Sequence, residues 1–151
     1  MACIIINFAA SIHCCAVDGH DLSKFPLLLN WCDNTSAVAW INKRCKASLG
    51  GRALGRIFIG LLLGSNLGIQ TDWISTFDNK IADDISRLCD ENGNYDYSQL
   101  IHDHDSLTSC RQFQPSDSLL GMIWGALRTN VSPDPRMLAK LQPRALGSIT
   151  S

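Results

Sequence analysis

Charged residues are scarce in this chain of 151 residues: they make up 18% of it, and the formal net charge is only -1. So weak an overall charge excludes a protein that binds nucleic acid by bulk electrostatic attraction alone. The charges are unevenly placed, with a balance of +4 over residues 33–66, -7 over residues 67–110 and +3 over residues 111–151. Such blocks suit a face that binds a charged ligand, and they are also typical of solvated faces.

The sequence also lacks the patterns of a disulfide framework or a zinc site. Its seven cysteines are odd in number, include no CxxC pair and stand inside apolar segments. This usage favours reduced, mostly buried thiols in an intracellular protein. The segment His102-Asp-His-Asp105 has ligand-type residues but lies in a polar acidic stretch without a framework, so we do not expect a metal there.

Long apolar runs are missing as well. Residues 1–17 are apolar, but no Lys or Arg precedes the run, and Asn7 and His13 interrupt it. The run Ile57–Leu63 is too short to span a bilayer. We therefore expect no signal peptide, no membrane span and a location in the cytoplasm or nucleus.

What is present is an alternation of helical and strand patterns. Apolar spacing predicts a helix over residues 4–16. The nearly continuous apolar run Pro26–Cys32 predicts a strand covered on both faces, as in parallel sheets. Residues 67–74 alternate and predict a second strand.

Helices are expected around these two strands. One is capped by Thr35 or Ser36 and broken by Gly50-Gly51, a second covers residues 52–63, and a third starts after Asp78 or Asn79. Two strands joined through helices should be parallel. Ligands bind outside the carboxyl ends of such strands, where Asp33 stands.

After residue 89 the sequence pattern changes to short helices separated by linkers. Residues 90–94 are a linker, and helices are expected over residues 95–102, 118–128 and 137–141. The helix over residues 118–128 has an apolar stripe of Leu119, Leu120, Ile123, Trp124 and Leu127. For all four tryptophans, core packing is the default expectation.

Two motifs carry a family likeness. The first is Leu29-Asn-Trp-Cys-Asp-Asn-Thr-Ser-Ala-Val-Ala-Trp-Ile41, in which an Asp closes a strand and a helix starts at once. The second is Asn79-Lys-Ile-Ala-Asp-Asp-Ile-Ser-Arg87. Together and in this order they resemble the C-terminal half of the ribonuclease H domain of a retrotransposon reverse transcriptase polyprotein, DIRS-like or LTR-type. The tail resembles the polyprotein extension that follows this domain.

The resemblance implies a fold and a division of the chain. The fold is α/β, a truncated ribonuclease H-like fold with two parallel strands and flanking helices, followed by a mostly helical C-terminal tail. Residues 1–89 form the partial domain, whose first three strands have no counterpart here, and residues 90–151 form the helical or loosely ordered extension.

The chemistry implied by the resemblance is hydrolysis of RNA in RNA–DNA hybrids by two Mg²⁺ ions that several carboxylates hold. Asp33 and Asp83 match two of the catalytic and metal-binding carboxylates, with Asp84 as the alternative to Asp83. Asn34, Arg52 and Arg56 are the nucleic-acid-binding candidates. Two further carboxylates of the family have no counterpart, so Mg²⁺ binding is expected to be weak or absent and the chain inactive alone.

Several of these candidate residues also have a purely structural interpretation. Asp33 could only cap the following helix, Asp83 could be a first-turn acid favoured by the helix dipole, and Arg52 and Arg56 could be solvated. The competing functions are a non-catalytic nucleic-acid-binding or protein-interaction module, and a nuclease completed by a separate chain. A polypeptide segment that pairs with the exposed edge of the first strand is the partner expected in addition to nucleic acid.

Overall fold

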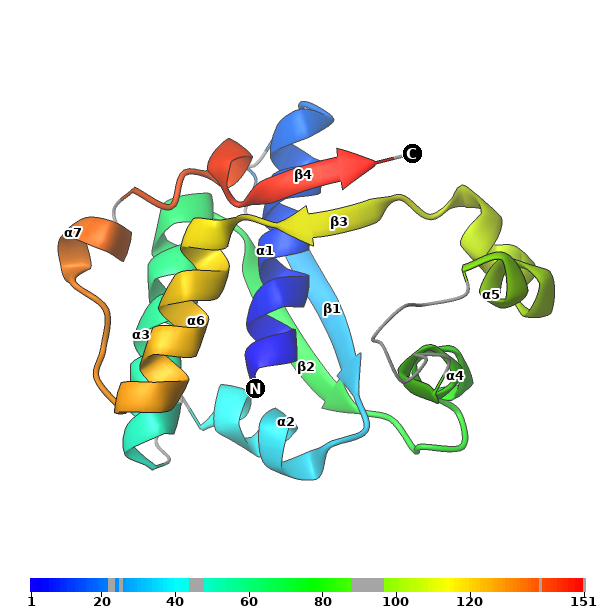
Figure 1. The fold of residues 1–151 in the computed structure, drawn as a ribbon, viewed down its shortest axis with the longest axis horizontal. Coiled ribbons are helices and arrows are strands. Elements are labelled where there is room, and N and C mark those ends of the chain that lie inside the picture. The colour runs from blue at the N-terminus through cyan, green and yellow to red at the C-terminus, as the bar shows by residue number, and fades with distance from the viewer. Residues whose placement is uncertain (22–23, 25, 44–47, 88–96, 139, 151) are drawn as a thin grey trace.

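The protein is described by a computed structural model, which covers residues 1–21, 24, 26–43, 48–87, 97–138 and 140–150 (Figure 1). Its elements are α1 (Ala2–Val17), β1 (Leu27–Cys32), α2 (Thr35–Asn42), α3 (Leu49–Ser65), β2 (Gly68–Trp73), α4 (Lys80–Arg87), α5 (Tyr97–Asp103), η2 (Asp105–Ser109), β3 (Gln112–Pro115), α6 (Asp117–Thr129), α7 (Pro135–Leu138), η3 (Pro143–Ala145) and β4 (Gly147–Thr150), where η marks a 3₁₀ helix.

The two strands of the first sheet are parallel, as the sequence predicts. β1 and β2 pair in register from Leu27 opposite Gly68 to Cys32 opposite Trp73, and α2 and α3 connect them. Both strands therefore end at the same edge of the sheet. The prediction of a mixed α/β fold with two parallel strands and flanking helices is confirmed at this level.

The prediction that β1 is covered on both faces is wrong. Burial alternates along the strand, and the side chains of Leu27, Leu29 and Trp31 are each more than half exposed. Leu28 and Cys32, on the opposite face, pack against the core. Apolar residues stand on both faces of β1, although only one face is covered. A continuous apolar run therefore does not distinguish this strand from one that is buried on both faces.

The core is built around α1. Ile5, Phe8 and Ile12 recur at helical spacing and are almost completely buried. The Phe8 ring lies 5.4 Å from that of Phe58 in α3, which in turn lies 6.2 Å from the Trp40 ring in α2. Aromatic pairs at these separations add to the burial of apolar surface and fix how the three helices meet.

The helix starts differ from the expected ones. Asn34, not Thr35 or Ser36, caps α2, because its side-chain oxygen accepts a hydrogen bond from the Ala37 N–H at 3.0 Å. Ser48 caps α3 in the same way, so Gly50 and Gly51 lie inside the first turn of α3 and do not break a helix. In both α2 and α3, the first residue is set by a polar side chain that accepts a hydrogen bond from a backbone N–H in the first turn.

The C-terminal residues contain a second sheet that the sequence pattern did not predict. β3 and β4 pair antiparallel, and α6 packs against α3. Leu119 of α6 and Leu146, just before β4, belong to the same buried cluster as α1. The predicted linker and the division at residues 89 and 90 lie outside the described residues.

Polar contacts, one buried and one exposed, join α1 to the C-terminal part of the chain. The buried His13 ring in α1 is 3.2 Å from the Pro143 carbonyl oxygen through Nδ1, and it lies against the ring of Phe113 at 5.6 Å. Arg111 donates two hydrogen bonds to the carboxylate of Asp18, at 2.9 and 2.6 Å. Strands β3 and β4 are therefore held to the C-terminal half of α1.

The prediction that all four tryptophans pack in the core is wrong for three of them. Trp40 is buried, whereas Trp31, Trp73 and Trp124 are each more than half exposed. The thiols also differ, because Cys3 and Cys110 are exposed and the other described cysteines are half-buried. Within the described ranges, no helix has both the length and the apolar character that crossing a bilayer requires.

Helix α3 offers a matched pair of substitutions for the core. The Leu54 side chain is 1% exposed and the Leu63 side chain 80% exposed. We expect Leu54→Ala to lower the free energy of unfolding by about 2–5 kcal/mol, because it leaves a cavity. Leu63→Ala should change it by roughly 0.5 kcal/mol or less. Urea unfolding measures both, and equal losses would contradict this packing.

The ion pair between Asp18 and Arg111 predicts a pH dependence. The hydrogen bonds from Arg111 hold the pKa of the Asp18 carboxyl below its ordinary value. The stabilisation is therefore complete above the ordinary pKa and is lost as the pH falls through the lowered pKa. We expect the thermal midpoint of Arg111→Gln to fall less between about pH 5 and about pH 2 than that of the unchanged protein. Parallel curves for the two proteins would contradict the assignment.

Candidate functional site

The carboxyl ends of β1 and β2 hold the first candidate, Asp33. This residue follows β1 directly and is half-buried. Its backbone carbonyl accepts a hydrogen bond from the Trp73 indole N–H at 3.1 Å, and the Ile74 N–H bonds the Cys32 carbonyl at 3.2 Å. The backbone of Asp33 is thus fixed at the strand ends, as the sequence placed it.

Asn34, the neighbouring candidate for nucleic-acid binding, is the N-cap of α2. Its side-chain oxygen caps α2, so the side chain is held in place by the helix, and the amide N–H₂ group is the part that can donate to a ligand. The plainer interpretation of Asp33 as the cap of this helix is wrong, because Asn34 has that position.

Asp83, the second candidate, lies in the first turn of α4 and forms a local ion pair. Its carboxylate is 2.8 Å from the guanidinium of Arg87, one turn further along the same helix. Both the first-turn position and the pairing at four-residue spacing stabilise the helix modestly. The positive charge of Arg87 beside this carboxylate would oppose the binding of a metal cation to it.

Asp84, the alternative to Asp83, points to another partner. Its carboxylate is 2.9 Å from Nε2 of His104, whose side chain is only 12% exposed. The sequence pattern predicted no role for His104, which lies in the motif His102-Asp-His-Asp105. The pairing joins α4 to the residues that follow α5, and no periodicity in the sequence indicates which acid a histidine twenty residues away will meet.

A hollow of about 520 Å³ lies beside this pair and is lined by Lys80, Asp84, Arg87, Asp103 and His104. The lining carries both signs of charge, so it selects neither an anion nor a cation by charge alone. Asp33 is not part of it. Helix α4 also lacks extensive contacts with β1 and β2 within the described part of the chain.

Arg52 and Arg56 lie one turn apart on the exposed side of α3. Figure 1 shows α3 and α4 on opposite sides of the molecule, with α1 between them in the view. The two guanidinium groups are therefore not assembled around Asp83. They form a short basic strip that could contact two successive phosphates of a nucleic acid backbone.

The donor set does not fit a two-metal centre. Such a centre requires several carboxylate oxygens that converge on two Mg²⁺ ions. Among the residues that the structure describes, no three His, Cys, Asp or Glu side chains form a group that could hold a metal ion. Asp33 and Asp83 remain the two candidates that the resemblance indicates, and among these same residues neither has the further carboxylates that such a centre needs.

Comparisons with family models, with curated proteins and with solved structures found no match to this chain. The likeness to ribonuclease H domains therefore depends on the two motifs that contain Asp33 and Asp83. What the geometry adds is the parallel pairing of β1 with β2 and the position of Asp33 at their common edge.

Proposed function

We propose that this chain is a ribonuclease H-like segment derived from a retroelement polyprotein, and that it does not cleave nucleic acid by itself. The observation that carries the proposal is a parallel β1–β2 pair in which an aspartate closes the first strand and an acidic helix follows the second. This order of strand, carboxylate, helices, strand and acidic helix is the order that the two motifs imply.

The absence of cleavage follows from the number of ligands. Hydrolysis by two Mg²⁺ ions depends on carboxylates that neutralise both ions and hold them at a short separation. Asp33 and Asp83 supply two carboxylates, and the second is already paired with Arg87. We therefore derive no catalytic step through a metal ion for this chain.

The test is incubation of the purified chain with a labelled RNA–DNA hybrid and Mg²⁺. We expect no cleavage beyond that of the buffer and no difference between the protein and its Asp33→Asn variant. Cleavage that requires Mg²⁺ and disappears in Asp33→Asn would overturn the inactive assignment and would show that Asp33 acts as a ligand.

Binding of the same hybrid tests the basic strip on α3. Neutralising both arginines in Arg52→Gln/Arg56→Gln should weaken binding and lower the slope of log affinity against log salt by roughly 2. Arg136→Gln, at an exposed arginine of α7, is the matched control and should leave the slope unchanged within about 0.5. An equal effect of the control would show that the α3 strip has no special role.

A second candidate function is supported by the uncovered face of β1. Leu27, Leu29 and Trp31 form an exposed apolar row, and the described residues provide no strand on the side of β1 opposite β2. The six residues of β1 carry no charge that would oppose pairing. We propose that an extended polypeptide strand from another chain pairs along this edge and places its own apolar side chains beside the row.

The uncovered row predicts self-association on heating. We expect Leu29→Lys to reduce light scattering near the thermal midpoint several-fold, because a charge on an exposed strand blocks non-native pairing. Leu63→Lys adds the same charge on α3 at a leucine that is even more exposed, and it should have a small effect. Equal suppression by the two variants would indicate that net charge, not the β1 edge, governs the association.

A further inference from the structure

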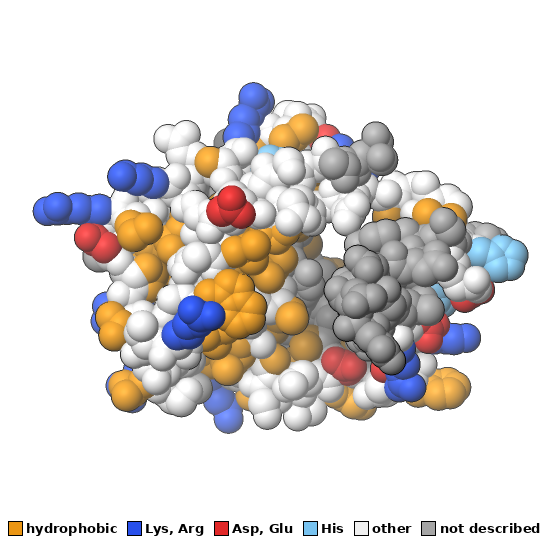
Figure 2. Space-filling view, in the orientation of Figure 1, with side chains coloured by type: hydrophobic (Ala, Val, Ile, Leu, Met, Phe, Trp, Pro, Cys, Tyr) orange, Lys and Arg blue, Asp and Glu red, His pale blue; other side chains and the backbone are white. Residues whose placement is uncertain are grey.

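Helix α6 presents an outward face that the two proposed functions do not use. Its inner side chains Leu119, Met122, Ile123 and Ala126 are buried. On the outer side, Trp124 is 58% exposed and Leu127 is 40% exposed. Figure 2 shows hydrophobic side chains gathered over the region where α6 lies in Figure 1. An exposed tryptophan on an ordered helix marks a candidate contact surface.

The two charges on this face have opposite signs and stand at opposite ends. Asp117 lies in the first turn of α6 and Arg128 in the last. Their separation in sequence is eleven positions, which is about three turns or about 16 Å along the axis, so both lie on the same side as Trp124. Both are exposed, and neither has an ion-pair partner among the described residues.

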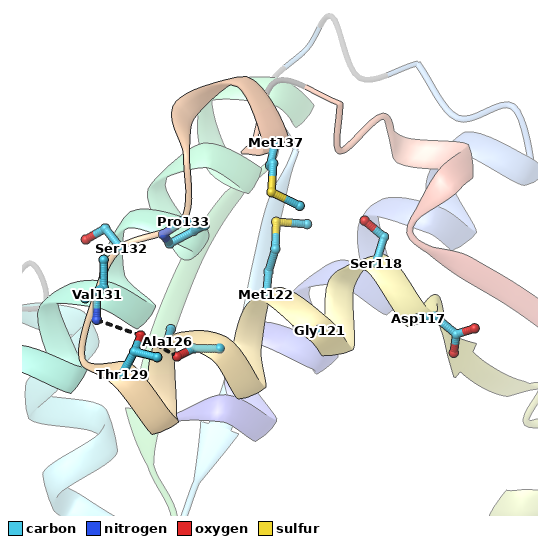
Figure 3. Close-up of a pocket in the computed structure, with 11 residues that line it drawn as sticks. Asp117, Ser118, Gly121, Met122, Ala126, Thr129, Val131, Ser132, Pro133 and Met137 are labelled. Carbon is cyan, nitrogen blue, oxygen red and sulfur yellow. Dashed lines mark hydrogen bonds between the residues drawn. The ribbon is translucent and has the colours of Figure 1, made fainter.

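Space for a bulky side chain lies between the two charges. A Cβ atom built at Gly121 or at Gly125 would meet no atom within 4 Å. Gly121 and Gly125 also line an open groove of about 460 Å³ between α6 and the segment Val131–Met137 (Figure 3). The surface of α6 next to Trp124 therefore has open space at Gly121 and Gly125, and the groove begins at these two positions.

We propose that this face binds a second copy of the chain, with the two α6 helices antiparallel about a two-fold axis. The axis passes midway between Asp117 and Arg128, so each Asp117 faces Arg128 of the second copy. Trp124 of each copy then lies over Gly121 of the other. A two-fold axis uses every contact twice, so one acid and one base at matched distances are sufficient for two ion pairs.

The charge pattern favours this occupant over others. A ligand with one sign of charge, such as nucleic acid, would be attracted by Arg128 and repelled by Asp117. An antiparallel copy satisfies both ends of the helix, whereas a parallel copy would place like charges together. One helix pair buries less than the roughly 800 Å² per partner of a standard interface, so the dimer should dissociate on dilution.

Two charge reversals test the arrangement. Asp117→Arg places a second guanidinium opposite Arg128, and Arg128→Asp places a second carboxylate opposite Asp117. Each variant alone should therefore dimerise about tenfold or more weakly than the unchanged protein. An equimolar mixture of the two should form a heterodimer, because both opposing pairs are then of opposite sign. Sedimentation velocity over a concentration series, with one variant labelled, measures both results.

Further variants separate this contact from other causes. Trp124→Ala should weaken the dimer without touching the charges, and Arg136→Asp, outside α6, should leave dimerisation unchanged. Circular dichroism and thermal melting check that each variant is folded, since charges at helix ends also affect the helix itself. Association through β1 would respond to Leu29→Lys and not to mixing.

Four outcomes would overturn the proposal. The unchanged protein could remain monomeric at all concentrations reached. The two charge variants could each dimerise as strongly as the unchanged protein, or fail to form a heterodimer when mixed. Binding of nucleic acid or of an unrelated protein to this face, in place of a second copy, would also contradict it.

Discussion

Helix α1 lies at the centre of the protein, and its apolar side chains are the surface against which α3 and the C-terminal elements pack. Ile5, Phe8, Ala9 and Ile12 have lost essentially all contact with solvent. Their helix contacts α3 from the middle of the chain, and β3, η3 and β4 from its end. Burial of this one helix therefore couples the N-terminal residues to residues more than a hundred positions away, and the C-terminal strands are held to the same centre.

The polar candidates lie away from this centre, and for two of them contacts with residues close in sequence determine the environment. Asp83 meets Arg87 on its own helix, and Asn34 meets a backbone N–H three residues ahead. Such contacts form as soon as the helix forms, and they do not require the rest of the fold. A two-metal centre, by contrast, requires carboxylates from several elements to converge. The described residues show the local contacts and not the convergence of carboxylates that a two-metal centre requires.

The surface has two apolar regions of different character. The row on β1 combines uncharged side chains with a strand edge that no described strand pairs with, so this edge offers its backbone hydrogen-bonding groups to an extended strand. The face of α6 combines a tryptophan with one acid and one base at defined spacing, so it selects its partner by charge and geometry. The first resembles an incompletely covered sheet, and the second has the self-complementary pattern of a symmetric interface.

Local sequence determined most of the elements of this protein, and tertiary structure decided which of their faces are covered. Apolar spacing predicted α1, β1, β2, α4 and α6, and the order of elements predicted the parallel pairing, because these depend on residues close in sequence. The same spacing assigned Trp124 and Leu127 to the core and both faces of β1 to the interior. These assignments were wrong, since an apolar side chain is buried only where another element covers it. The candidate aspartates were placed correctly at the end of β1 and in the first turn of α4. Their partners Arg87 and His104, and the strands β3 and β4 that close over α1, depend on contacts that only the folded chain creates.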